Sequence, residues 1–150
     1  MGKVLADNKN AYYNYEILDT YEAGMVLTGQ EVKSIRAGKI SLKGSYIILK
    51  GKEVYLVGAF ISPYQPKNTP ENYDPERFRK LLLNKAEIKQ LLGKTKEKGL
   101  ALIPLKIYTK RARIKLAFGI GKGKKKSDKR ETIKRREVNR DIDRELKTRG

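Results

Sequence analysis

The side chains that could do chemistry in this chain are mainly cations. Lys and Arg number 35 against 17 Asp and Glu, which gives a formal net charge of +18. Guanidinium groups bind phosphate oxygens in pairs, and ammonium groups bind them as point charges. A chain this basic is expected to bind nucleic acid, with an affinity that falls steeply as the salt concentration rises.

Groups that commonly act as catalysts are scarce. The chain has no Cys and no His, which excludes zinc fingers, thiol catalysis, His-based acid-base chemistry and Ser-His-Asp triads. No pair of acidic residues has a spacing typical of metal ligands, so a metal-dependent nuclease that uses Glu22 is the weakest alternative. We expect no enzyme activity, no metal and no cofactor.

The segment from residue 122 to residue 150 has the highest density of charge, with thirteen Lys or Arg and six Asp or Glu. Its large apolar side chains are only Ile133, Val138, Ile142 and Leu146. So few apolar groups cannot offset the entropy of ordering the segment, so we expect it to be disordered when free. On a helix, Arg136, Arg140 and Arg144 would form one stripe opposite the last three of these apolar side chains. We therefore expect a helix when RNA is bound, with a permanently solvated basic tail as the alternative.

The residues before this tail alternate between strand and helix signals. Residues 8–18 are polar at first and then strand-like, and residues 21–24 read as a break before a second short strand. Thr28 and Glu31 have the spacing of a capping box, so we expect a helix over residues 29–37, ended by Gly38. Lys33 and Arg36 share one face of that helix and could bind phosphates, although two solvated surface charges are an equal alternative.

Residues 45–120 carry the signals of two hairpins and one more helix. Residues 45–50 and 53–60 flank a Gly51-Lys52 turn, and a proline-rich loop over residues 62–76 follows. Asn84 is the expected N-cap of a helix that runs to about residue 98. Residues 100–109 and 112–120 form the last hairpin, with an edge or a bulge expected at Pro104 because proline cannot donate to a ladder.

Together these elements predict a mainly β fold, a small antiparallel OB-like β-barrel of about six strands with two or three helices. The barrel is expected over residues 1–121 and the flexible basic tail over residues 122–150. The longest apolar run, residues 54–61, is too short to span a bilayer. With no signal-peptide pattern at the N-terminus, we expect a cytoplasmic protein without membrane contact, monomeric in solution.

Several separated motifs resemble one family, small protein B, the bacterial tmRNA-binding (SsrA-binding) factors of trans-translation. They are GMVLTGQEVKSIRAGK at residues 24–39, ISPY at 61–64, RKLLLN at 79–84, and KGKK and DKRE at 122–125 and 128–131. The resemblance implies an OB-like barrel that binds the tRNA-like domain of tmRNA and delivers it to the A site of a stalled ribosome. It also implies that the tail occupies the decoding centre and the empty mRNA channel as a helix. A basic OB-fold ribosomal protein or translation factor is the alternative.

The resemblance also assigns roles to individual residues. Glu22, Leu82 and Asn84 correspond to positions that the family uses for RNA binding, and Asn8, Lys9, Lys33 and Arg36 are plausible additions. The tail residues implied for the ribosome are Lys122, Lys124, Lys125, Asp128, Lys129 and Arg130. Since a carboxylate cannot bind phosphate, Glu22 would accept hydrogen bonds from base amino or imino groups. Ser127 stands where many members carry His, so stacking on a decoding-centre base by that residue is not available here.

Overall fold

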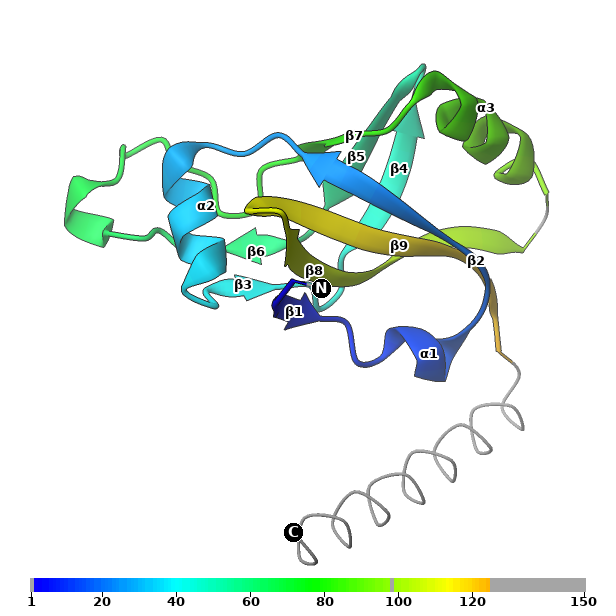
Figure 1. Cartoon of the computed structure of the whole chain (residues 1–150), viewed down its shortest axis with the longest axis horizontal. Coiled ribbons are helices and arrows are strands. Elements are labelled where there is room, and N and C mark those ends of the chain that lie inside the picture. The colour runs from blue at the N-terminus through cyan, green and yellow to red at the C-terminus, as the bar shows by residue number, and fades with distance from the viewer. Residues whose placement is uncertain (1, 98, 125–150) are drawn as a thin grey trace, which may run out of the picture.

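Nine strands and three α-helices make up the described part of the chain, residues 2–97 and 99–124 of this computed structural model (Figure 1). The strands are β1 Val4–Asp7, β2 Tyr15–Met25, β3 Ile40–Ser41, β4 Tyr46–Lys50, β5 Glu53–Val57, β6 Phe60–Ile61, β7 Arg79–Leu82, β8 Leu100–Lys110 and β9 Arg113–Gly123. The helices are α1 Ala11–Asn14, α2 Gly29–Arg36 and α3 Lys85–Lys94, with a 3-10 turn over Pro66–Asn68. Only Lys122, Gly123 and Lys124 of the tail expected over residues 122–150 belong to the described part of the chain.

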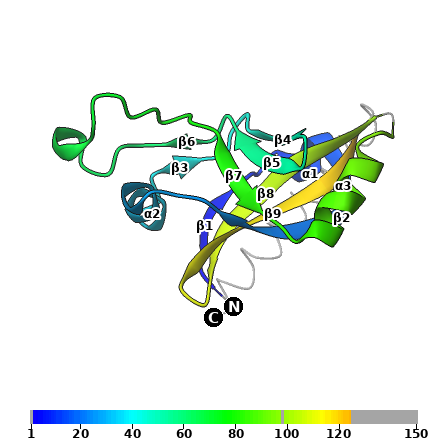
Figure 2. The ribbon, with the colours of Figure 1, turned by 90° about the horizontal axis from the view of Figure 1, so that it is seen from above.

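Seven strands form one antiparallel sheet in the order β1-β8-β9-β2-β7-β5-β4, and β3 pairs with β6 in a separate sheet. The long strands β2, β8 and β9 form its middle, while α2 and α3 lie at opposite ends (Figures 1 and 2). The sheet curls so that β4 comes close to β8. In the described residues β4 and β1 do not pair with each other, so the barrel is open. The expected mainly β, OB-like antiparallel architecture is confirmed, with the short strands β1, β3 and β6 in addition.

The core follows the two-residue period of the strands. On β9, Ile114, Leu116, Phe118 and Ile120 are buried against the concave side of the sheet. Opposite them, Gly119 and Gly121 leave room for a second apolar cluster that contains Ile103 and Leu105. A Cβ at Gly119 would lie 2.8 Å from Ile17 Cγ2, so glycine is needed here for close packing.

The break expected at residues 21–24 is wrong, because β2 runs without interruption from Tyr15 to Met25. Tyr21 and Ala23 are 8% and 1% exposed and point into the core at alternate positions. Gly24 pairs with Lys115 on one side and Leu82 on the other. Pairing on both edges therefore overrides the turn preference of this glycine, which instead permits close approach of the neighbouring strands.

The helix over residues 29–37 is confirmed as α2. Thr28 Oγ1 accepts a hydrogen bond from Glu31 N at 3.2 Å, and Glu31 Oε1 accepts one from Thr28 N at 2.9 Å. The helix capped by Asn84 is also confirmed, but it ends at Lys94 rather than near residue 98, with a C-cap at Thr95. Its start was predicted better than its end because the capping box is a local signal, whereas the helix has no equally local signal at its C-terminus.

The turns explain how the hairpins close. Gly51 has a φ of 62° in the two-residue turn between β4 and β5, as expected from its position. Pro104 lies at a β-bulge of the β8–β9 pair, which confirms that expectation. The β8–β9 turn is a two-residue loop in which Arg111 and Ala112 have φ of 50° and 65°. Such left-handed pairs match the strand twist but are usually Asn or Gly, so this turn stores backbone strain.

Candidate nucleic-acid interface

The outer surface of β8, β9, β2 and β7 carries a row of residues fixed by the strand register. Tyr108 lies opposite Lys115, Lys115 opposite Gly24, and Gly24 opposite Leu82. The inner faces of the same strands are apolar, so these residues must point outward. We call this surface the basic face, and its residues are Glu22, Gly24, Leu82, Lys106, Tyr108, Lys110, Arg113 and Lys115. Four of the eight are cations and one is a carboxylate, so the surface suits an anionic partner.

Glu22 lies at the centre of a hydrogen-bonded group on this face. The Tyr108 hydroxyl donates to Glu22 Oε2, and Lys110 Nζ lies 3.1 Å from Glu22 Oε1. The hydrogen bond from Tyr108, and then the Lys110 ammonium, lower the pKa of Glu22 although partial burial opposes this. Burial and the hydrogen bond to Glu22 raise the pKa of Tyr108. At neutral pH the group therefore holds an ionised carboxylate beside a protonated phenol.

Leu82 is the last residue of β7, and Asn84 is the N-cap of α3 two residues later. Leu82 is 53% exposed on the basic face, with its Cβ side toward Gly24. Asn84 Oδ1 accepts a hydrogen bond from Glu87 N at 2.9 Å, so its oxygen is used as the cap of α3. The capping bond uses one lone pair of Oδ1, and the two amide N–H groups of Asn84 are available as donors to RNA.

The two cations of α2 lie at the edge of the basic face but contact different loops. Arg36 Nη2 donates to Ala112 O at 2.7 Å, in the strained β8–β9 turn. Lys33 Nζ lies 6.0 Å from the centroid of the Tyr64 ring in the proline-rich loop. Both side chains belong to exposed residues, so they extend the positive surface around the end of the sheet.

Glu31 and Arg79 form a buried ion pair that sequence reasoning missed. Arg79 Nε and Nη2 lie 2.9 and 2.7 Å from Glu31 Oε2, and both side chains are 0% exposed. Arg77 also donates to Glu31 Oε1 from a more exposed position. Burial alone would raise the pKa of Glu31, but the Thr28 N–H and the two arginines lower it. The pair locks α2 against β7 and so fixes Arg36 relative to Leu82.

Asn8 and Lys9 lie away from Glu22, because they follow β1 and both β8 and β9 separate β1 from β2. They border the β8 edge of the basic face, where Asp7 pairs with Lys106. Asn8 Nδ2 donates to Pro104 O at 2.8 Å, which satisfies the bulge on β8.

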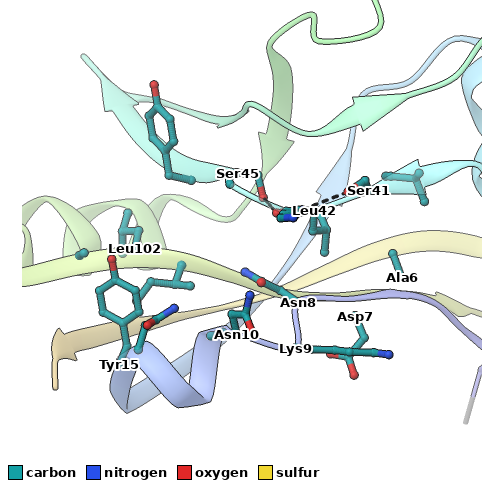
Figure 3. A pocket seen from close by; sticks show the side chains of 18 residues that line it. Ala6, Asp7, Asn8, Lys9, Asn10, Tyr15, Ser41, Leu42, Ser45 and Leu102 are labelled. Carbon is teal, nitrogen blue, oxygen red and sulfur yellow. Dashed lines mark hydrogen bonds between the residues drawn. The ribbon is translucent and has the colours of Figure 1, made fainter. Parts of the chain in front are cut away.

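Asn8 and Lys9 line a groove of about 840 Å³ together with Ser41, Leu42 and Ser45. Figure 3 shows Asn8 on the side of the groove opposite Leu42 and Ser45. The groove lies between β1 and α1 on one side and β3 with the loop over residues 42–45 on the other, and β8 also lines it. The structure does not bring Asn8 and Lys9 together with Glu22.

The described start of the tail is attached to the barrel. Lys122 is exposed near the end of β9, opposite Glu16. Lys124 N donates to Asn14 O at 2.9 Å, and Lys124 Nζ donates to Tyr12 O at 2.7 Å. The remaining tail residues implied for the ribosome lie outside the described residues. They are Lys125, Asp128, Lys129 and Arg130.

Within residues 2–97 and 99–124, no group of three or more Asp or Glu side chains is arranged to hold a metal ion. No helix in the same residues is long and apolar enough to cross a membrane.

The open antiparallel barrel and its basic face define a class of protein, the small OB-like modules that bind nucleic acid. A family model described as SmpB protein matches residues 5–148. The chain therefore belongs to the SmpB protein family.

Individual relatives agree with this membership. The SsrA-binding protein of Trichormus variabilis is 52% identical over 145 residues, covering 97% of this chain and 94% of the relative. That of Geobacillus sp. is 53% identical over 148 residues, covering 99% and 95%. A solved chain described as "tmRNA-SmpB: a journey to the center of the bacterial ribosome" is 47% identical with a TM-score of 0.65, covering 85% of this chain and 92% of that one.

Proposed function

We propose that this protein binds tmRNA, also called SsrA RNA, and acts with it in trans-translation on stalled ribosomes. The observation that carries the proposal is identity of about half over nearly the whole length to proteins named SsrA-binding protein. The similar solved chain, whose description names tmRNA and the bacterial ribosome, supports both partners. The protein acts by binding rather than by catalysis, in the cytoplasm and as a monomer.

The basic face is the surface proposed to contact the tRNA-like domain. Its cations, together with Lys33 and Arg36, would neutralise backbone phosphates. Glu22 would accept hydrogen bonds from a base edge, and Leu82 would give an apolar contact beside it. Asn84 would donate from its amide nitrogen while its oxygen caps α3. Affinity comes from the cations and specificity from the other three side chains.

Asn8 and Lys9 are proposed as a second and separate RNA contact. They line the groove between β1 and β3, and both β8 and β9 separate them from Glu22 on β2. Lys9 supplies a charge there, and Asn8 keeps one amide N–H for RNA while it donates the other to Pro104 O. This contact would extend the RNA-binding surface around the barrel without completing the Glu22 site.

The division of labour between barrel and tail is also a proposal. Residues 1–121 would bind tmRNA, and residues 122–150 would form a helix in the decoding centre and the empty mRNA channel. Lys122, Lys124, Lys125, Asp128, Lys129 and Arg130 are the residues proposed to contact the ribosome. Because Lys124 is hydrogen-bonded to Tyr12 and Asn14, the cut that spares the barrel falls after Lys124.

Truncation after Lys124 tests this division. We expect the shortened protein to bind tmRNA within about tenfold of the full chain, a change of about 1.4 kcal/mol. Peptide tagging on stalled ribosomes should be abolished. If the truncation destroyed tmRNA binding while the barrel kept its circular dichroism spectrum, the division would be wrong.

Charge removal on the basic face tests the binding surface itself. Exchange of Arg113 and Lys115 for Gln should weaken binding of the tRNA-like domain and reduce the log-log salt slope by about one per lost phosphate contact. The matched control exchanges Lys67 and Lys89 for Gln, which removes the same charge from exposed positions in the proline-rich loop and on α3. Equal effects of both pairs would show a non-specific charge effect and contradict the proposed surface.

A further inference from the structure

We propose that the outer surface of β7, β5 and β4 stacks an unpaired base of the bound RNA on the ring of Phe78, and this proposal rests on the proposed function. These strands pair side by side beyond β2, so their outer surface lies next to the basic face and is separate from Glu22 and its partners (Figure 2). We call this surface the aromatic face, and its residues are Val26, Tyr46, Ile48, Tyr55, Phe78 and Lys80.

The aromatic face points outward because of the two-residue period of its strands. Successive side chains in a strand point to opposite sides of the sheet. The residues that alternate with the aromatic face along β4, β5 and β7 lie in the core and are at most 6% exposed: Ile47, Val54, Leu56, Arg79 and Leu81. The residues between and beside them must therefore lie on the outer surface of the sheet.

Large apolar side chains gather on this surface. Phe78, Tyr46 and Val26 are 54%, 52% and 46% exposed. Val26 belongs to the surface because its N–H donates to Lys80 O at 3.0 Å and continues the β2–β7 pairing. With Leu82 at the border of the basic face, these are four of the eight large apolar side chains that are exposed in the described residues. Single exposed apolar residues need no explanation, but a cluster beside a charged surface indicates a binding site.

Phe78 is supported on one side by Tyr55. The centroids of the two rings are 6.4 Å apart and the ring planes are inclined by 51°. The Tyr55 hydroxyl donates to Glu53 Oε2, and Lys80 Nζ lies 3.3 Å from Glu53 Oε1. These contacts hold the Tyr55 ring in place, so Phe78 rests against a fixed neighbour while most of its own ring stays open to a ligand. Such a platform needs little ordering when a base binds.

The charges around the aromatic face favour RNA as its partner. Lys50 and Lys52 lie at the β4–β5 turn, and Lys80 pairs with the carboxylate of Glu53. On the other side, Leu82 lies two residues beyond Lys80 on the same side of β7 and leads into the basic face. A single strand that leaves the basic face would therefore keep its phosphates near ammonium groups while its bases meet aromatic rings.

The size of the apolar surface also suits a base better than a protein. The exposed parts of Val26, Tyr46 and Phe78 together offer roughly 300 Å², since a large side chain buries about 150–250 Å² in full. A standard protein interface buries about 800 Å² on each partner. Stacking of one base on one ring adds about 5- to 100-fold in affinity. Every base has a π face, so this contact adds affinity without selecting a particular base.

The experiment measures the affinity of the full-length protein for tmRNA over a series of salt concentrations. Phe78→Leu keeps an apolar side chain but loses the π face, so it should bind about 5- to 100-fold more weakly. Its log-log salt slope should equal that of wild type, because no phosphate contact is lost. Phe78→Tyr keeps the ring and should bind as wild type does.

Tyr12→Leu is the matched control for loss of an exposed ring. Tyr12 is 50% exposed but lies on α1, away from the aromatic face. This variant should keep the wild-type affinity. Thermal melts followed by far-UV circular dichroism should show the same Tm for all the variants, because the exchanged rings lie at the surface.

The outcomes separate this proposal from the proposed function. If wild type and Phe78→Leu bind tmRNA equally well, the aromatic face is refuted while tmRNA binding stands. If Phe78→Tyr or Tyr12→Leu loses as much affinity as Phe78→Leu, the effect is not stacking on this ring, and the proposal is again refuted. Self-association of wild type in sedimentation velocity that Phe78→Leu abolishes would make this surface an interface between two copies and contradict RNA as its partner. If wild type does not bind tmRNA, the proposed function itself fails.

Discussion

Replacement of Arg79 by Met should strongly destabilise the barrel, because it leaves the Glu31 carboxylate buried with a weaker partner. The Arg79 guanidinium donates twice to Glu31 Oε2, at 2.9 and 2.7 Å. Its Nη1 also donates to Ala59 O at 3.0 Å and Pro75 O at 2.9 Å. Both partners of the ion pair are 0% exposed. Met has similar length and no charge, so it removes these hydrogen bonds without opening a large cavity.

The expected loss is about 3 to 5 kcal/mol in the free energy of unfolding, the range for removal of one member of a buried pair. Arg77 also pairs with Glu31 and should keep the loss near the lower end of that range. Arg77→Met is the matched control, since its side chain is 41% exposed, and it should lose less than about 1 kcal/mol.

Urea unfolding followed by far-UV circular dichroism measures both values. The double variant Glu31→Gln with Arg79→Met should be more stable than the sum of the single losses predicts, by about 1 to 3 kcal/mol, because it leaves no unpaired charge. Two results would refute the reasoning: a loss under about 1 kcal/mol for Arg79→Met, or strict additivity in the double variant.

Three further perturbations test the fold. The pKa of Glu31 is lowered from its ordinary value of 4.5. The ionised Glu31 therefore contributes its full stabilisation above pH 4.5, and this stabilisation is lost as the pH falls through the folded-state pKa. In urea titrations, wild type should lose more stability on acidification than Glu31→Gln. Exchange of Arg111 for Asn together with Ala112 for Gly should relieve the backbone strain of two residues with positive φ. We expect the free energy of unfolding to rise by about 1 kcal/mol, seen as a higher Tm with tmRNA binding intact. An unchanged Tm would argue against strain in this turn. Gly119→Ala should destabilise by about 1 to 3 kcal/mol, while Gly123→Ala, where nothing lies within 4 Å, should be neutral; equal effects in urea unfolding would contradict the packing account.

Local signals in the sequence predicted the helix starts and the hairpin turns well. The strand expected over residues 53–60 is too long, because β5 ends at Val57, Gly58 has a φ of 81°, and Phe60–Ile61 pair with β3 instead. Thr28 with Glu31, and Asn84 with Glu87, are contacts within four residues, so spacing alone identifies them. The Gly-first turn at Gly51 is equally local. These are the elements for which the structure confirms the predicted positions.

Features that depend on distant pairing could not be predicted in the same way. The contact of Glu31 with Arg79 joins residues 48 positions apart, and only the fold shows that the capping residue is also half of a buried ion pair. The break expected around Gly24 failed because the two strands that pair with β2 are not evident from its own residues. β1 was missed because four residues at the edge of the sheet carry too little periodicity.

In the candidate site, too, features with a local signal could be predicted and contacts between distant strands could not. Family resemblance indicated Glu22 and Leu82, and the register of β2 with β7 and β9 explains why they share a surface. Tyr108 and Lys110 as partners of Glu22 were not predicted, since their approach depends on the register of β8 with β9. The signal that could have found them is the alternation of Lys106, Tyr108 and Lys110 with the apolar residues of the same strand.

We propose that this protein selects tmRNA from all the RNA of its cell. Sequencing the RNA that copurifies with the full-length protein from its native host tests this claim most directly. We predict that tmRNA is strongly enriched over its share of total RNA after a wash at moderate salt. Recovery of ribosomal and transfer RNA in their cellular proportions, with no enrichment of tmRNA, would contradict it.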